Sequence, residues 1–358
     1  MKILHIAYFG KNGNYNGIYE AVYSLAMAQA KLGVSVKVAI TSHQPVVDNN
    51  FIYFTPTLRE FKPLLNDFSP DLVVFNSLYE FQQITFSHEL RKRKMPYILA
   101  FHGGASKDNA RKGWLKKKIA NYLFWNYFIS KAKAVVYLNQ NEFNKSIFKR
   151  TNKKYFIIPN GVELPVNPLK YEGRKMNIAF LSRIDFYGKG LDVLLPAIQQ
   201  LYDEGWEDKI QFLFYGFPSD DSYKKLSQFG DFLRYKGYVR GEEKSEAFRN
   251  AFLNILPSRS EGMPMTILEA LSYGRPCMVT PMTNMGDLIV NNNCGWLIEL
   301  TVESIVSTIK KAYDEFLTTP NKYYSNCIKA AEEYSWQNIS MKTLAMYKEI
   351  LCNNGQNI

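Results

Sequence analysis

One stretch of the chain, residues 254–280, constrains the fold more than any other, because four structural signals follow one another within it. It has the sequence NILPSRSEGMPMTILEALSYGRPCMVT. Pro264 suits a first helical turn, where no backbone donor is needed, and Gly274 suits a helix end. The stretch therefore predicts a strand ending at Leu256, a loop at Ser258–Gly262, a helix at Met265–Tyr273 and a strand at Cys277–Thr280.

Two carboxylates flank the start of this helix, where a phosphate group is favoured. The amide N–H groups and the positive end of the helix dipole there attract anions. Glu261 precedes the helix, and Glu269 lies inside it on the face opposite Ile267, Leu268 and Leu271. A loop glutamate and a solvated helix face would explain both residues equally well. Alternatively, the two glutamates accept hydrogen bonds from hydroxyl groups, which a sugar nucleotide carries on both sides of its diphosphate.

The same stretch resembles the signature of the retaining GT-B glycosyltransferases of family 4. The family's two signature glutamates are separated by seven residues, as Glu261 and Glu269 are. The motif is long and ordered. The matching residues are Pro257-Ser258, Glu261-Gly262, Pro264, Leu268-Glu269-Ala270 and Gly274-Arg275-Pro276.

Length and composition predict a folded protein of two domains. The chain has 358 residues, of which 46% are hydrophobic and 15% aromatic, and this length exceeds one ordinary core. Its four cysteines form no close pair and have no metal-ligand spacing with the four histidines, so we expect free thiols in a reducing cytoplasm. We find no signal peptide and no apolar run long enough to span a membrane.

The net charge of +11 is concentrated in the first half. Residues 1–164 contain 23 Lys and Arg against 10 Asp and Glu, whereas residues 165–358 contain 21 against 23. The first half should therefore meet an anionic partner, either a membrane surface or an acidic acceptor. Nucleic acid ranks last, because no nucleic-acid-binding module is visible.

Strands and helices alternate in residues 1–164, which predicts a doubly wound parallel sheet. The loop before Gly17 is rich in glycine and asparagine but lacks the spacing of a dinucleotide fingerprint. His102-Gly103 ends one strand, and that histidine is as readily explained by a structural hydrogen bond as by a ligand. The resemblance favours a ligand, because the family commonly has a histidine–glycine pair here, near the transferred sugar, and often a cleft-lining glycine at Gly17.

Residues 109–133 are basic at their ends and aromatic in the middle, as in NARKGWLKKKIANYLFWNYFISKAK. Lys112 and Lys116–Lys118 accompany Trp114 and Trp125 there. Such a helix can lie on an anionic bilayer with its aromatic residues inserted. A core helix with solvated lysines is the alternative, which we slightly favour because the fold needs a helix in this place.

The second domain restarts with a strand near Asn177–Ser182 and a loop that contains two cations. Arg183 and Lys189 flank this loop, which leads into a helix near Leu191. Two cations beside a helix N-terminus can neutralise a diphosphate. Pro196 predicts that this helix either begins late, near Val193, or is kinked.

The predicted architecture is a GT-B fold, an α/β protein in which two Rossmann-like domains face each other across a cleft. We expect an acceptor-binding domain at residues 1–164 and a donor-binding domain at 175–335. Residues 336–358 should form a helix that packs back on the first domain, because a similar tryptophan-containing segment does so in GT-B enzymes.

The resemblance implies retaining transfer of a sugar from a nucleotide-diphosphate sugar to a hydroxyl acceptor. The acceptor would be a saccharide or a lipid-linked molecule in polysaccharide or glycolipid synthesis. No Asp-x-Asp triplet occurs, so we expect neither a cofactor nor an essential divalent metal. The candidate catalytic residues are Glu261, His102, Arg183 and Lys189. The candidate donor-binding residues are Gly17, Arg183, Lys189, Gly216, Glu261, Gly262, Met263, Pro264, Met265 and Glu269.

Two other functions compete with this interpretation. A GT-B sugar-nucleotide epimerase or hydrolase would share the fold and the phosphate site but would need no acceptor. A non-catalytic scaffold at the membrane surface would need only the basic first half. The intact set of Arg183, Lys189, Glu261 and Glu269 argues against the scaffold. The donor sugar, the base, the acceptor and the linkage are not determined by the sequence.

Overall fold

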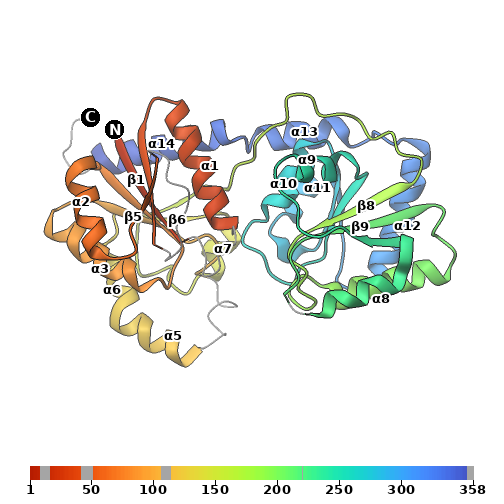
Figure 1. Ribbon diagram of the computed structural model, residues 1–358, viewed down its shortest axis with the longest axis horizontal. Coiled ribbons are helices and arrows are strands. Elements are labelled where there is room, and N and C mark those ends of the chain that lie inside the picture. Colours follow the sequence, from red (N-terminus) through yellow and green to blue (C-terminus); the bar gives the residue numbers. More distant parts are fainter. Residues whose placement is uncertain (9–16, 42–50, 106–113, 220, 353–358) are drawn as a thin grey trace. The chain divides into compact units, whose positions relative to one another are not determined.

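The protein is described by a computed structural model covering residues 1–8, 17–41, 51–105, 114–219 and 221–352. The chain divides into two compact units (Figure 1). The first consists of Met1–Gly161 together with Trp336–Ile358, and the second of Val162–Ser335. The Phe9–Asn16 loop before Gly17 and residues 109–113 of the basic segment lie outside the described residues.

The first unit is built on a parallel sheet of seven strands in the order β3-β2-β1-β4-β5-β6-β7. Its central strands are buried on both sides, as expected where helices cover both faces of a parallel sheet. The strands are β1 (Lys2–Ala7), β2 (Ser35–Ile40), β3 (Ile52–Phe54), β4 (Leu72–Asn76), β5 (Tyr97–Ala100), β6 (Val135–Tyr137) and β7 (Tyr155–Ile157).

Most helices described in the first unit connect these strands, and the C-terminal helix packs back on the same unit. They are α1 (Gly17–Lys31), α2 (Leu58–Phe68), α3 (Phe81–Lys92), α5 (Trp114–Ala120), the π-helical turn η1 (Asn121–Trp125), α6 (Asn126–Lys131), α7 (Gln140–Lys145) and α14 (Trp336–Cys352).

The π-helical turn decides which aromatic residues of the basic segment are buried. Trp125 is 1% exposed and packs in the core against Phe128, with ring centroids 5.6 Å apart. For Trp125 the structure therefore agrees with the core-helix alternative, which the sequence slightly favoured, and not with insertion into a bilayer. The exposed large apolar residues of this segment are Ile119, Tyr122, Leu123, Phe124 and Tyr127.

The second unit repeats the same plan with a parallel sheet of six strands, in the order β10-β9-β8-β11-β12-β13. The strands are β8 (Met176–Leu181), β9 (Ile210–Tyr215), β10 (Leu233–Tyr235), β11 (Leu253–Leu256), β12 (Cys277–Val279) and β13 (Gly295–Leu297). Its described helices are α8 (Leu191–Asp203), the 3₁₀ segment η2 (Asp221–Phe232), α9 (Glu242–Arg249), α10 (Met265–Ser272), the 3₁₀ turn η3 (Pro281–Thr283), α11 (Gly286–Asn291), α12 (Val302–Thr318) and α13 (Tyr324–Glu332).

Helix α8 begins at Leu191 with Pro196 inside it, so the predicted late start near Val193 is wrong. Gly190 precedes the helix in a left-handed conformation, with φ of +72°. The backbone N–H groups of Val193 and Leu194 both donate to the Gly190 carbonyl. Pro196 lies in the second turn of the helix.

Helix α14 packs on the first unit and completes its core. Met346, Tyr347, Ile350 and Leu351 belong to the same apolar cluster as the strand residues Ile3, Val38 and Val74. Gly161 lies so close to the Trp336 ring that a Cβ there would come within 2.4 Å of it. The predicted return of the C-terminal helix and the two Rossmann-like domains are confirmed. None of the described helices combines the length and the apolar character needed to cross a bilayer.

Candidate active site

Lys189 and Glu261 meet at the carboxyl edge of the second sheet, because two loops approach each other closely. A Cβ at Gly190 would lie 2.1 Å from the Pro257 carbonyl oxygen, so only glycine fits. The Arg259 N–H also donates to the Gly188 carbonyl, at 3.0 Å. As a result the Lys189 Nζ lies 2.5 Å from the Glu261 Oε1, and the two side chains are only 16% and 13% exposed.

The Glu261 carboxylate is held by further groups, which the sequence pattern does not single out. Ser258 Oγ donates to the same Oε1 at 2.6 Å. Asn284 Nδ2 donates to the backbone carbonyls of Glu261 and Gly262, at 2.7 and 3.1 Å. The Glu261 N–H donates to the Met282 carbonyl. Glu261 therefore has a defined orientation at the entrance to α10.

Helix α10 begins beside this cluster. No described side chain caps its first turn. Pro264 is the N-cap residue, and its extended backbone (ψ of +116°) directs the chain into the helix. Gly262, Met263 and Met265 are the sequence neighbours of Pro264 at the start of the helix, and Met263 is buried. A helix N-terminus without a side-chain cap is suited to an anionic ligand.

Glu269 lies one turn into α10 and pairs with a lysine of the neighbouring helix. Lys244 Nζ of α9 lies 2.6 Å from Glu269 Oε1, and the two side chains are 20% and 16% exposed. A simple solvated helix face, one of the two sequence-based interpretations, therefore does not describe Glu269. Lys244 was not predicted, because its partner on another helix cannot be read from local spacing.

Arg183 and Gly216 follow the adjacent strands β8 and β9. The exposed Arg183 guanidinium pairs with Asp185, at 2.8 Å. A Cβ at Gly216 would lie 1.8 Å from the Ser182 carbonyl oxygen, so the glycine permits a close approach of the two strand ends. The structure therefore gives the two predicted cations different partners, Asp185 for Arg183 and Glu261 for Lys189.

The loop that carries Lys189 is fixed by an arginine from the β11–α10 loop. Arg259 forms a two-pronged ion pair with Asp192, with N–O distances of 2.6 and 2.8 Å. Its guanidinium also lies 4.1 Å from the centre of the Tyr187 ring. Planar two-point pairing of this kind restricts side-chain motion more than a lysine would.

His102 and Gly17, the other two predicted site residues, belong to the first unit. Gly17 is the exposed first residue of α1. His102 follows β5 with φ of +47°, and its Nε2 lies 3.1 Å from Asn76 Oδ1. Burial among apolar groups lowers the pKa of His102 to about 4, and His5 adds to this effect. The imidazole is therefore neutral near pH 7.

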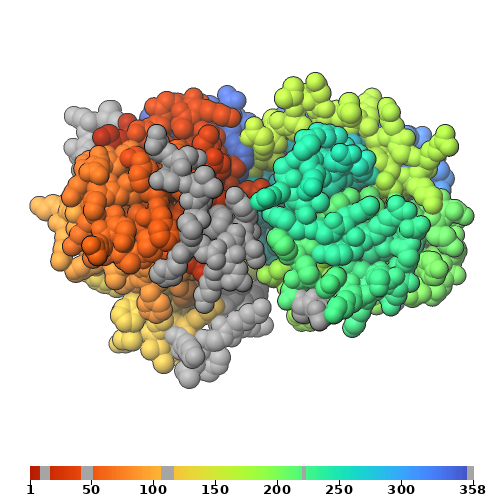
Figure 2. All heavy atoms as spheres, in the orientation of Figure 1, coloured from red at the N-terminus to blue at the C-terminus, as the bar shows by residue number. Residues whose placement is uncertain are grey.

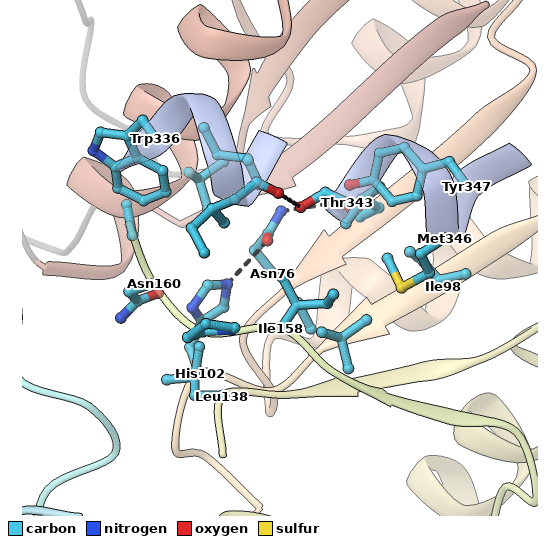
Figure 3. Close-up of a pocket in the computed structure, with 18 residues that line it drawn as sticks. Asn76, Ile98, His102, Leu138, Ile158, Asn160, Trp336, Thr343, Met346 and Tyr347 are labelled. Carbon is cyan, nitrogen blue, oxygen red and sulfur yellow. Dashed lines mark hydrogen bonds between the residues drawn. The ribbon is translucent and has the colours of Figure 1, made fainter. Parts of the chain in front are cut away.

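A crevice under α14 lies beside His102 (Figure 3). Its volume is about 40 Å³, and Asn76, Trp336 and Thr343 contribute to its wall. A water molecule occupies roughly 30 Å³ in the liquid, so the crevice is far too small for a sugar. Within the described ranges, no group of three or more His, Cys, Asp or Glu residues is arranged to hold a metal ion.

Two parallel-sheet Rossmann-like domains, with the last helix returning to the first domain, define the GT-B class. The fold matches that of sucrose-phosphate synthase from Thermosynechococcus elongatus, with a TM-score of 0.74 and 16% identity over 98% of this chain and 99% of that chain. It also matches HepE of Anabaena, determined in complex with UDP and glucose. There the TM-score is 0.72, with 16% identity over 98% and 100% of the two chains.

Within this class, residues 175–315 match the family described as Glycosyl transferases group 1. An uncharacterised glycosyltransferase of Methanocaldococcus jannaschii is 23% identical over 329 residues, which cover 84% of this chain and 86% of that protein. The fold and the sequence similarity together support a glycosyltransferase of the GT-B type.

Proposed function

We propose that the protein is a retaining glycosyltransferase that moves a sugar from a nucleotide-diphosphate sugar to a hydroxyl acceptor. The observation that carries this proposal is the cluster of Lys189, Glu261 and Ser258 at the entrance to α10. A cation and a helix N-terminus suit a diphosphate, and an oriented carboxylate suits sugar hydroxyls. Glu269, one turn further along α10, and Lys244 of the neighbouring α9 would bind the hydroxyls of the ribose.

In the reaction, the bond between the sugar C1 and the diphosphate oxygen breaks, and the electron pair leaves with the phosphate. Lys189 exchanges its contact with Glu261 for one with the leaving diphosphate, and Arg183 adds a second positive charge. The first turn of α10 stabilises the same negative charge with its backbone N–H groups. The released Glu261 carboxylate keeps Ser258 as a hydrogen-bond donor and accepts a second hydrogen bond from the sugar.

The acceptor oxygen then forms a bond to C1 on the face that the phosphate leaves, so the anomeric configuration is retained. The acceptor's proton passes to the departing phosphate oxygen, which is the nearest strong base in this scheme. The neutral His102 of the first unit would accept a hydrogen bond from a hydroxyl group of a substrate. Gly17, at the start of α1, would let a ligand approach the backbone closely.

We propose that this reaction needs no divalent metal, because Lys189, Arg183 and the helix N-terminus together oppose the diphosphate charge. Turnover should be unchanged by EDTA at a concentration that strips added Mg²⁺ and Mn²⁺. A loss of activity with EDTA that Mg²⁺ or Mn²⁺ restores would show that the positive charge of the protein is insufficient.

The acceptor is proposed to be lipid-linked and reached at an anionic membrane surface. The side chains of Tyr122 and Leu123 are 82% and 55% exposed, which is unusual for large apolar groups at neighbouring positions. Lys117 and Lys118 lie one turn away on α5. In Figure 2 the yellow atoms at the lower edge of the first unit belong to this segment. Apolar side chains beside lysines match an anionic bilayer in both polarity and charge.

The direct test is a donor screen. The purified protein is incubated with a panel of nucleotide sugars, with and without saccharide and lipid-linked acceptors, and the products are identified by mass spectrometry. We expect transfer from one donor class, and NMR of the new anomeric proton should show the donor's configuration. Release of free sugar at the same rate with and without an acceptor would instead indicate a hydrolase.

A further inference from the structure

Asn76, at the end of β4, has only one acceptable amide orientation. Its Nδ2 lies 3.2 Å from each of two backbone carbonyl oxygens, those of Ile6 and Val74. If the amide were flipped, its oxygen would face two other oxygens with no proton between them. Asn76 is also almost completely buried, so water cannot compensate for a wrong orientation. The Asn76 oxygen must therefore point to its remaining neighbour, His102.

This orientation determines the tautomer of His102. The atom that faces His102 Nε2 at 3.1 Å is the Asn76 oxygen, which accepts a hydrogen bond and cannot donate one (Figure 3). Nε2 must therefore carry the imidazole proton. A neutral imidazole has a single N–H, so Nδ1 is left with a lone pair. Near pH 7 the ring is neutral, and Nδ1 is an acceptor.

The backbone of His102 is also held in a conformation that it would not adopt alone. His102 and Gly103 have φ of +47° and +81°, and the Gly104 N–H donates to the Phe101 carbonyl at 2.9 Å. This is a tight turn with two left-handed residues. A left-handed backbone conformation is strained for a residue other than glycine, so other contacts must maintain the turn.

Glu142 provides these contacts from the first turn of α7. Its Oε1 accepts the Gly103 N–H at 2.6 Å, and its Oε2 accepts the Leu138 N–H at 2.7 Å. Asn139, the N-cap residue of α7, accepts the Glu142 N–H at 2.8 Å. The Glu142 side chain is buried and thus ties the turn after β5 to the end of β6.

We propose that Asn76 and Glu142 are positioning residues that hold His102 as an Nε2-protonated imidazole whose Nδ1 is a hydrogen-bond acceptor for a ligand. Asn76 sets the tautomer, and Glu142 holds the turn that aims the ring. The ligand of Nδ1 would be a hydroxyl group, because only a donor can pair with it. This inference rests on the proposed function for its ligand, but its claim about the tautomer does not.

Nitrogen NMR of the full-length protein tests the tautomer directly. With ¹⁵N in the histidine rings, at pH 7.5, the His102 signals are assigned by their loss in His102→Asn. We expect a protonated Nε2 and an unprotonated Nδ1 in the wild type, and a mixture of tautomers in Asn76→Leu. A matched control is Asn152→Leu, which removes another buried amide of this unit that donates to two backbone carbonyls. A protonated Nδ1 in the wild type, or an unchanged tautomer in Asn76→Leu, overturns the proposal.

Kinetics test the role of Glu142. Glu142→Gln replaces one carboxylate oxygen with a donor, so one of the two backbone N–H groups loses its acceptor and the turn relaxes. We expect kcat to fall about tenfold, since small misplacements of a reacting group have large effects on rate. The donor KM should stay within about twofold. Glu89→Gln, which breaks the ion pair of Glu89 with Arg93 on α3, should leave both constants unchanged.

The two experiments separate this inference from the proposed function. Wild-type kcat in Glu142→Gln, with His102→Asn inactive, would refute the positioning role of Glu142. Wild-type turnover in His102→Asn would instead remove His102 from the proposed mechanism. In that case the NMR result alone decides whether Asn76 sets the tautomer.

Discussion

At the scale of single residues, the candidate donor site is a set of charges already paired with one another. Lys189 neutralises Glu261, and Lys244 neutralises Glu269, at N–O distances of 2.5 and 2.6 Å. Pairing lowers the free-energy cost of these mostly buried charges while no ligand is bound, because an isolated charge would incur the full desolvation penalty. A diphosphate can replace a carboxylate as the partner of a lysine without leaving that lysine unpaired.

Lys189→Ala should lower kcat/KM about a hundredfold, because removing one preorganised positive contact to a developing negative charge has an effect of this size. The loss should appear mainly in kcat, since the charge of the leaving group is greatest in the transition state. The measurement is steady-state kinetics at saturating acceptor. Lys310→Ala, which removes the ion pair of Lys310 with Glu204 in the same unit, is the control. Equal kinetics for both variants would exclude Lys189 from the site.

At the scale of elements, the segment α5–η1–α6 shows how one π-helical turn rearranges a helix face. A π turn contains an additional residue, so side chains beyond it no longer follow the helical wheel that begins at α5. Trp125 and Phe128 consequently point into the core, while Tyr122 and Leu123 remain outside. The exposed apolar group therefore contains Tyr122 and Leu123 but not Trp125.

Vesicle co-sedimentation tests whether this segment binds membranes. We expect binding to vesicles that contain anionic lipid, with weaker binding at high salt, because lysines near the surface contribute about 1 kcal/mol each within a Debye length. Tyr122→Ser combined with Leu123→Ser should remove the salt-resistant part of the binding. Val166→Ser combined with Leu317→Ser alters two exposed apolar residues of the second unit and serves as the control. Equal sedimentation of the two double variants would mean that this face does not dock on membranes.

At the scale of the whole molecule, the buried His5 and the partly buried His102 should make the first unit sensitive to acid. Burial lowers the pKa values of His5 and His102 to about 4, and the hydrogen bond of His5 to Gln29 opposes this only partly. Above pH 6.5 both rings are neutral whether the chain is folded or unfolded. As the pH falls from 6.5 to 4, the unfolded chain takes up protons that the folded chain does not, so stability is lost in this window.

Each of the two histidines should contribute up to about 1.4 kcal/mol of lost stability per pH unit below 6.5. The measurement is the midpoint of urea unfolding between pH 7.5 and 4.5. His5→Gln should reduce the slope of the midpoint against pH, whereas His88→Gln, at an exposed position on α3, should not. The same slope in His5→Gln as in the wild type would mean that the buried ring is not the source of the acid sensitivity.

Local sequence patterns were sufficient to predict most of the architecture. The alternation of buried strands and amphipathic helices predicts two parallel sheets, and the motif around Glu261 and Glu269 predicts the β11–α10 unit. Such patterns are reliable because they depend on residues close together in the chain.

The partners of the charged residues were decided only by the tertiary structure. Lys189 meets Glu261 because Gly190 lets two loops touch across 72 positions of the sequence. The pairing of Lys244 with Glu269 likewise depends on how α9 lies beside α10. Asn76 reaches His102 from β4 and sets its tautomer, and Glu142 of α7 holds the turn in which His102 lies. Composition and spacing determine which chemistry is present in this chain, but distances between distant residues depend on close packing, which local sequence does not encode.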